Sequence, residues 1–111
     1  RMDIEQLCRI VGLESVPDQR PDIVALGILR RAEWVRAFIG HHVLLLLEKA
    51  EEGAPAESIG RLCELVSNAL SKRCAVLWTT RDRTIWKNAN FNNLRRFRLS
   101  GGKMFQDGEI Q

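Results

Sequence analysis

Apolar residues recur at three- and four-residue steps over most of the first 80 residues, the spacing that places side chains on one face of an α-helix. The pattern predicts helices at residues 3–13, 21–52 and 55–78. Asp3 suits the N-cap of the first helix, and Gly12 suits its end. The chain is therefore expected to be mainly α, a small helical bundle of three to four helices with a basic C-terminal segment.

The second of these segments is apolar on more sides than one neighbouring helix would cover. Val43–Leu47 are five consecutive apolar residues, which wrap more than a full helical turn. Such a helix is either surrounded inside the monomer or pairs with itself in a homodimer through Leu44, Leu45 and Leu47. Gly40 marks a close helix crossing or a break into two helices, since glycine is unfavourable inside a helix.

A length of 111 residues accommodates one hydrophobic core and is too short for two. We expect residues 1–80 to form a helical core and residues 81–111 to form a basic, aromatic-containing element packed on the same single domain. Helical periodicity fades in this second part. Residues 92–97 are compatible with a short helix, and residues 97–105 with a β-hairpin that turns at two glycines, so both alternatives stay open.

Positive charge is concentrated in the second half of the chain. Between residues 72 and 103 there are nine basic residues and only one acidic residue, Asp82, and aromatic residues are interleaved with them. Basic side chains neutralise phosphates and exposed aromatic rings stack on unpaired bases, so this composition is typical of a nucleic-acid surface. The candidate contacts are Lys72, Arg73, Arg81, Arg83, Trp86, Lys87, Phe91, Arg95, Arg96, Arg98 and Lys103.

The first functional hypothesis is thus a helical domain that binds nucleic acid, DNA or RNA, through its basic C-terminal segment. The same charges would also suit an acidic protein surface. The alternative hypothesis is accordingly a helical protein-protein interaction or oligomerisation module within a larger assembly, with its basic half docked on an acidic partner. The signal is compositional, because no zinc-finger spacing and no basic region before a leucine zipper accompanies it.

No residue pattern in the sequence indicates catalysis, and we expect neither an enzyme nor a cofactor. Three cysteines without a CxxC pair suit neither a disulfide framework nor a zinc ribbon, and they are interpreted as small core residues in a reducing compartment. His41 and His42 are adjacent, so on a helix they would point about 100° apart and could not share a metal easily. The glutamates at positions 48, 51 and 52 are interpreted as a solvated helix end.

The sequence predicts no membrane association. Its longest uncharged stretch in the hydrophobic middle, residues 37–47, is shorter than the roughly 20 apolar residues of a membrane-spanning helix. The N-terminus has no basic region followed by an apolar one, as a secretory signal would. We therefore expect an intracellular protein, cytoplasmic or nuclear.

Overall fold

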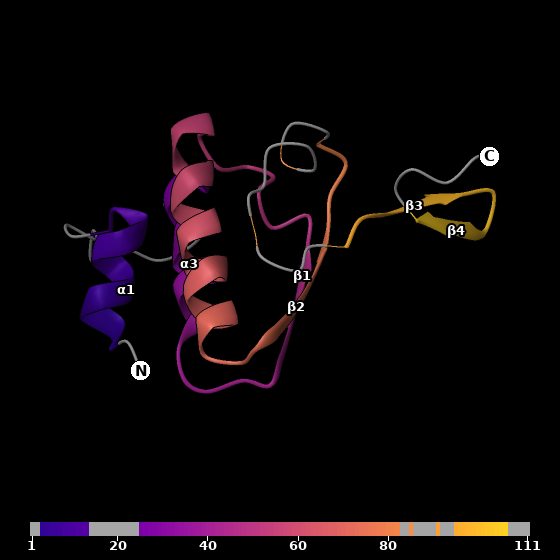
Figure 1. Cartoon of the computed structure of the whole chain (residues 1–111). Coiled ribbons are helices and arrows are strands. Elements are labelled where there is room, and N and C mark those ends of the chain that lie inside the picture. Colours follow the sequence, from indigo (N-terminus) through magenta and orange to yellow (C-terminus); the bar gives the residue numbers. More distant parts are fainter. Residues whose placement is uncertain (1–2, 14–24, 83–84, 86–90, 92–94, 107–111) are drawn as a thin grey trace. The chain divides into compact units, whose positions relative to one another are not determined.

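Two parallel strands joined by a helical crossover organise the first part of the chain, shown as a computed structural model in Figure 1. The structure describes residues 3–13, 25–82, 85, 91 and 95–106, and the chain divides into two compact units, Arg1–Arg81 and Asp82–Gln111. The elements of the first unit are α1 (Ile4–Val11), α2 (Leu26–Phe38), β1 (Leu44–Glu48), the 3-10 turn η2 (Ala56–Ser58), α3 (Ile59–Ser71) and β2 (Ala75–Thr79). The second unit contains β3 (Phe97–Ser100) and β4 (Lys103–Gln106).

The described residues thus form three α-helices and four strands in two small sheets, a mixture of α and β structure. The prediction of a mainly α bundle of three to four helices is wrong. Among the helices in the described part of the chain, none has the length and apolar character that crossing a membrane requires.

The predicted first helix is confirmed as α1. Asp3 accepts a hydrogen bond from the backbone of Gln6, whose side chain in turn accepts one from the backbone N–H of Asp3. This reciprocal capping box satisfies donors that a helix start leaves unpaired. Gly12 ends the helix with φ 78°, a left-handed conformation that glycine adopts without a steric penalty. Leu7 and Val11 are buried, and α1 packs against both α2 and α3.

The predicted second helix ends much earlier than its apolar pattern suggested. Its last residue is Phe38, Ile39 is extended, and Gly40 takes φ 91°, so Gly40 marks a break. The chain then continues as β1 rather than as a second helix. A run of five apolar residues fits a buried strand as well as a buried helix, and the periodicity of apolar residues does not separate the two cases.

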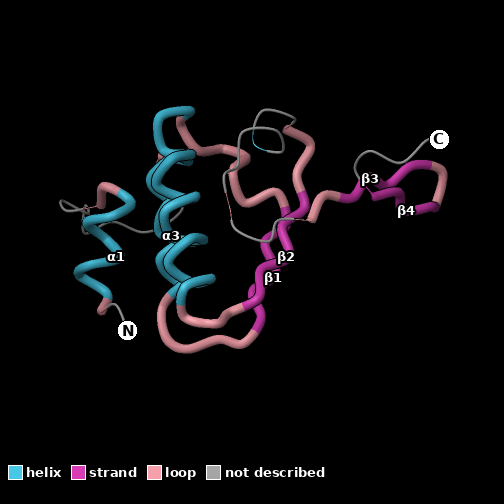
Figure 2. Tube along the Cα trace, in the orientation of Figure 1, coloured by secondary structure: helices cyan, strands magenta, loops and turns pink. Residues whose placement is uncertain are grey.

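The third segment changes from helix to strand at its end. The helix α3 stops at Ser71, Arg73 adopts φ 63°, and Ala75–Thr79 form β2, so the predicted helix to residue 78 is too long. β1 and β2 pair in parallel, with Leu45 opposite Val76 and Leu47 opposite Trp78. The crossover through α3 supplies the connection that parallel strands need (Figure 2).

One face of this two-stranded sheet contributes to the core. Leu45 packs with Ala69 of α3 and with Cys74, and Phe38 and Val76 lie against this cluster. Leu45 and Leu47 are buried, whereas Leu44, the first residue of β1, is 53% exposed. The predicted helical pairing surface of Leu44, Leu45 and Leu47 therefore does not exist in that form, because alternate residues of a strand point to opposite faces.

The second unit contains the β-hairpin that was one of two alternatives for residues 92–105. β3 and β4 are antiparallel, and Gly101 and Gly102 connect them with φ 56° and 75°. Two successive positive φ angles characterise the tight turn whose twist matches that of the flanking strands, and glycine is the residue that adopts them most readily. Part of the alternative helix, residues 92–94, lies outside the described residues.

Candidate nucleic-acid interface

The hairpin separates charged from apolar side chains. Paired residues of an antiparallel sheet share a face, so the register places Arg98 and Lys103 together on one face with Ser100 and Phe105. The opposite face carries Phe97, Leu99, Met104 and Gln106. Leu99 and Met104 are 75% and 63% exposed, and Lys103 is exposed too. The hairpin therefore offers one basic face and one apolar face.

Two arginines of this unit have distinctive surroundings. The guanidinium of exposed Arg95 lies over the ring of Phe97, 5.3 Å from its centroid, which is a cation-π contact. Two nitrogens of Arg98, Nε and Nη2, are buried and have no hydrogen-bond partner among the described residues. Buried donors that remain unsatisfied are costly, so an anionic acceptor such as a phosphate oxygen would be favourable at Arg98.

The remaining predicted contacts of the C-terminal segment are less defined. Phe91 and Arg96 are partly buried, and Arg96 is engaged in a further interaction. Arg83, Trp86 and Lys87 lie outside the described residues.

Three predicted basic contacts belong to the first unit. Lys72 and Arg73 are adjacent and exposed in the turn between α3 and β2. Arg81 is exposed beyond the other end of β2, a strand of five residues. At about 3.3 Å per residue, the strand holds Arg81 well apart from the other two. The structure therefore brings together Lys72 with Arg73 in the first unit, and Arg98 with Lys103 on one face of the hairpin in the second.

Glu51 is a buried acidic residue that sequence analysis placed in a solvated helix end, which is wrong. It follows β1 and is only 7% exposed. Its two carboxylate oxygens accept hydrogen bonds from Trp78 Nε1 at 2.9 Å and from Thr80 Oγ1 at 2.7 Å. Both oxygens are thus occupied in joining the loop after β1 to the end of β2. The sequence offered one signal for a buried acceptor, the indole N–H of Trp78, because a buried indole needs a hydrogen-bond acceptor.

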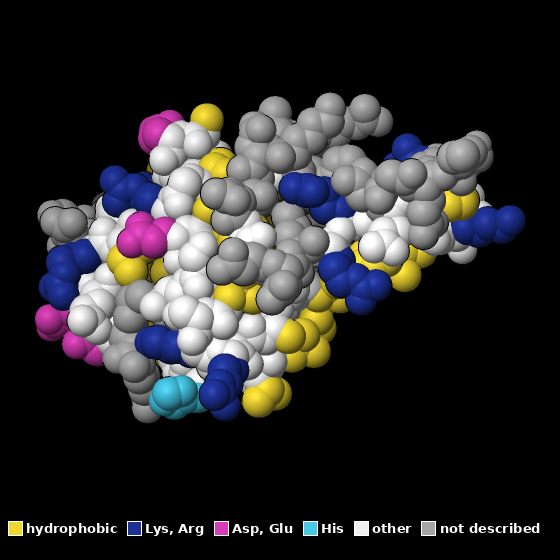
Figure 3. All heavy atoms as spheres, in the orientation of Figure 1, with side chains coloured by type: hydrophobic (Ala, Val, Ile, Leu, Met, Phe, Trp, Pro, Cys, Tyr) yellow, Lys and Arg dark blue, Asp and Glu magenta, His cyan; other side chains and the backbone are white. Residues whose placement is uncertain are grey.

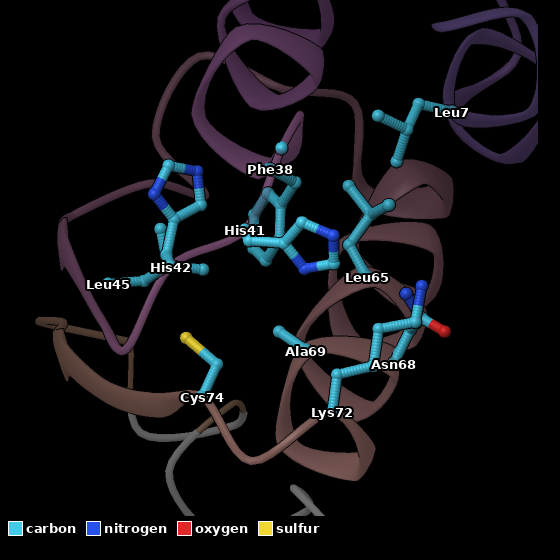
Figure 4. Close-up of a pocket in the computed structure, with 11 residues that line it drawn as sticks. Leu7, Phe38, His41, His42, Leu45, Leu65, Asn68, Ala69, Lys72 and Cys74 are labelled. Carbon is cyan, nitrogen blue, oxygen red and sulfur yellow. The ribbon is translucent and has the colours of Figure 1, made fainter. Parts of the chain in front are cut away.

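A small cavity lies beside the two histidines (Figure 4). Its volume is about 40 Å³, and it is lined by apolar residues together with His41, His42, Asn68, Lys72 and Cys74. Pockets for small molecules usually have about 300–1,000 Å³, so this cavity has room for a few water molecules only. The histidines lie between α2 and β1 rather than on a helix, and His42 Nε2 lies 2.9 Å from the carbonyl oxygen of Ile39.

The cysteines contribute little reactivity. Cys8 and Cys63 are half-buried, Cys74 is buried, and all three are free thiols. Burial raises the pKa of the Cys63 thiol, which keeps it protonated and weakly nucleophilic at neutral pH. Cys74 donates to the carbonyl of its neighbour Ala75 at 3.3 Å. Within the described ranges, no group of three or more His, Cys, Asp or Glu side chains is placed to hold a metal ion.

No family model matches this chain, and no curated protein is significantly similar to it in sequence.

Proposed function

We propose that this chain binds nucleic acid through the β3–β4 hairpin and the arginines that lead into it. The support is the state of Arg98, whose two buried guanidinium nitrogens lack an acceptor in the described structure. A phosphate accepts from two nitrogens of one guanidinium at once, so it would complete both hydrogen bonds once a rotation of the Arg98 side chain exposed these nitrogens. Lys103 on the same hairpin face would add a second phosphate contact.

The charge of the surrounding segment supports the same proposal. Residues 83–106 include six basic residues and no acidic one, so no carboxylate within that segment competes for these cations. On the other hairpin face, Phe97 with Arg95 over its ring offers a flat surface on which a base can stack. Binding should therefore weaken steeply as the salt concentration rises.

The test is fluorescence anisotropy with labelled single-stranded and double-stranded DNA and RNA at several salt concentrations. The double variant Arg98→Ala/Lys103→Ala removes two cations from one hairpin face. It should weaken binding at least about tenfold at low salt and reduce the slope of log K against log salt by about 1.4–1.8, the value for two phosphate contacts.

The matched control is Arg9→Ala/Arg36→Ala, which removes the same charge from exposed positions on α1 and α2. It should leave the affinity within about twofold and the slope unchanged, because neither arginine belongs to the proposed contact surface. Equal losses in both double variants would mean that net charge, rather than the hairpin, governs binding. No binding of the unmodified chain to any of the four probes at low salt would overturn the proposal.

The alternative is that the hairpin docks an acidic protein surface. The exposed Leu99 and Met104 favour it, since apolar side chains beside cations are common in protein interfaces. Substitution of Leu99 by Ser tests whether this exposed side chain takes part in nucleic-acid binding. It should leave nucleic-acid affinity nearly unchanged if phosphates and Phe97 dominate, and a strong loss would indicate that the apolar face carries the contact.

A further inference from the structure

The parallel sheet of the first unit has a second face that the helices do not cover. Leu44 and Leu46 of β1 and Ala75 and Leu77 of β2 lie on it, since they alternate with the buried residues and are paired in register. The three leucines are 53%, 68% and 59% exposed in chain order. We call these four residues the open sheet face. In Figure 3 hydrophobic side chains gather where β1 and β2 lie in Figure 1.

An uncovered apolar face is unusual for parallel strands. Sheets of this kind occur almost only with both faces covered, because their strands carry apolar side chains on each side. Here α3 covers the face of Leu45 and Val76, and it leaves Leu46 and Leu77 side by side in water. Adjacent exposed leucines on neighbouring strands form one continuous apolar surface, which is characteristic of an interface.

We propose that a second copy of this chain covers the open sheet face with its own open sheet face, forming a homodimer of two packed sheets. The proposal is independent of nucleic-acid binding. Like surfaces are self-complementary under a two-fold axis, and two sheets pack about 10 Å apart with their side chains interdigitated. It replaces the helical pairing that was one of two alternatives for this segment, and Leu46 and Leu77 take the place of the buried Leu45 and Leu47.

The charges at the two ends of the strands favour one orientation. Glu48 is exposed at the carboxyl end of β1 on the same face as Leu44 and Leu46, and Arg73 is exposed just before the amino end of β2. If the strands of both copies ran in the same direction, two Glu48 carboxylates would meet at one end. With the strands opposed, each Glu48 lies at the end that carries Arg73 of the second copy. We therefore expect the opposed arrangement.

The area of the open sheet face indicates a weak dimer. Its apolar side chains offer roughly 300 Å² per copy, whereas a stable interface buries roughly 800 Å² on each partner, polar rim included. Such an interface belongs with transient complexes, and dimers should form at concentrations of about tens to hundreds of micromolar.

Sedimentation equilibrium over a range of about 5 to 500 µM tests the proposal on the full chain. The mass should rise from that of one chain, 12.7 kDa, toward twice that value. Leu46→Asp should raise the dissociation constant at least tenfold, because a carboxylate at the centre of an apolar interface loses its hydration. Leu99→Asp is the matched control: it places the same change at an exposed strand leucine of the hairpin, and it should leave the dissociation constant unchanged.

A charge exchange tests the orientation. Glu48→Arg and Arg73→Glu should each weaken the dimer several-fold, and the double variant should restore it. Circular dichroism checks that each variant keeps the fold. We expect that it does, because the substituted residues are exposed. A strict monomer at 500 µM would overturn the proposal, and it would leave the face to a different partner. A dimer that is insensitive to Leu46→Asp but broken by Leu99→Asp would overturn it as well, by placing the contact on the hairpin.

Discussion

The carboxylate of Glu51 illustrates how one residue joins elements that are distant in sequence. It follows β1, yet its hydrogen bonds go to Trp78 in β2 and to Thr80 just beyond it. The preceding carbonyl, of Ala50, accepts a hydrogen bond from the buried indole of Trp34 on α2 at 2.8 Å. Residues 50 and 51 therefore tie the end of the sheet to α2 through polar contacts in a largely apolar surrounding, where unsatisfied groups are costly.

Glu51→Gln should lower the free energy of unfolding by about 1–3 kcal/mol, because it removes the negative charge that strengthens both hydrogen bonds and reverses the one to Thr80, whose hydroxyl would have to accept from the new NH₂ group. Urea unfolding followed by circular dichroism measures the change. The control is Glu52→Gln at the exposed neighbouring position, which should change stability by less than about 0.5 kcal/mol. Equal effects at both positions would contradict the role assigned to Glu51.

At the scale of elements, the end of α1 is held by side chains from the other two helices. Arg31 Nη1 of α2 donates to the carbonyls of Val11 and Gly12 at 3.2 and 3.3 Å, and Arg61 Nη1 of α3 donates to that of Ile10 at 3.1 Å. The last carbonyls of a helix have no partner within it, and cations are favourable there. These contacts explain how a helix of eight residues is kept in place.

Two glycine substitutions should have opposite effects. Gly12→Ala should destabilise the protein by about 1–2 kcal/mol, because an alanine at φ 78° is strained, and its Cβ would lie 2.9 Å from Arg61 Nη1. Gly60→Ala, inside α3, should stabilise it by about 0.5–1 kcal/mol, since its Cβ meets nothing within 4 Å. Thermal unfolding of the two variants beside the unmodified protein provides the comparison. A gain in stability from Gly12→Ala would refute the assigned cap.

Elements differed in how well the sequence predicted them, for a physical reason. The helix α1 carries its start and stop signals in its own residues, Asp3 and Gly12, and the hairpin turn does so in its two glycines. β1 and β2 form because they pair with each other across about 30 residues, and such pairing leaves no local signal. Leu77 continues the helical spacing of the apolar residues in α3, so the sequence pattern did not indicate that β2 begins at Ala75.

The candidate interface was predictable in composition and not in geometry. The sequence identified Arg95, Arg98 and Lys103 as basic, but the shared face of Arg98 and Lys103 depends on the register of the hairpin. The open sheet face could not be predicted from the sequence, because it depends on the pairing of Leu46 with Leu77 on two parallel strands.

At the scale of the whole molecule, pairing of two copies links stability to concentration. A second copy that binds the folded chain stabilises it by mass action, so the unfolding midpoint should rise with protein concentration. Well above the dissociation constant, each tenfold rise should add about 0.7 kcal/mol per chain, half of the value for a single ligand, because each dimer holds two chains. Leu46→Asp should abolish this dependence. A midpoint that stays constant in the unmodified chain would argue against the dimer.

The indoles of Trp34 and Trp78, which donate hydrogen bonds to residues 50 and 51, also provide an intrinsic fluorescence signal for this part of the molecule. Trp34 is almost fully buried and Trp78 partly so, and each donates its N–H to this loop. In a Trp86→Phe background, the remaining emission would come from these two rings alone. Loosening of the loop would admit water to both and shift their emission to longer wavelength, so opening at the edge of the sheet could be followed in real time without an attached dye.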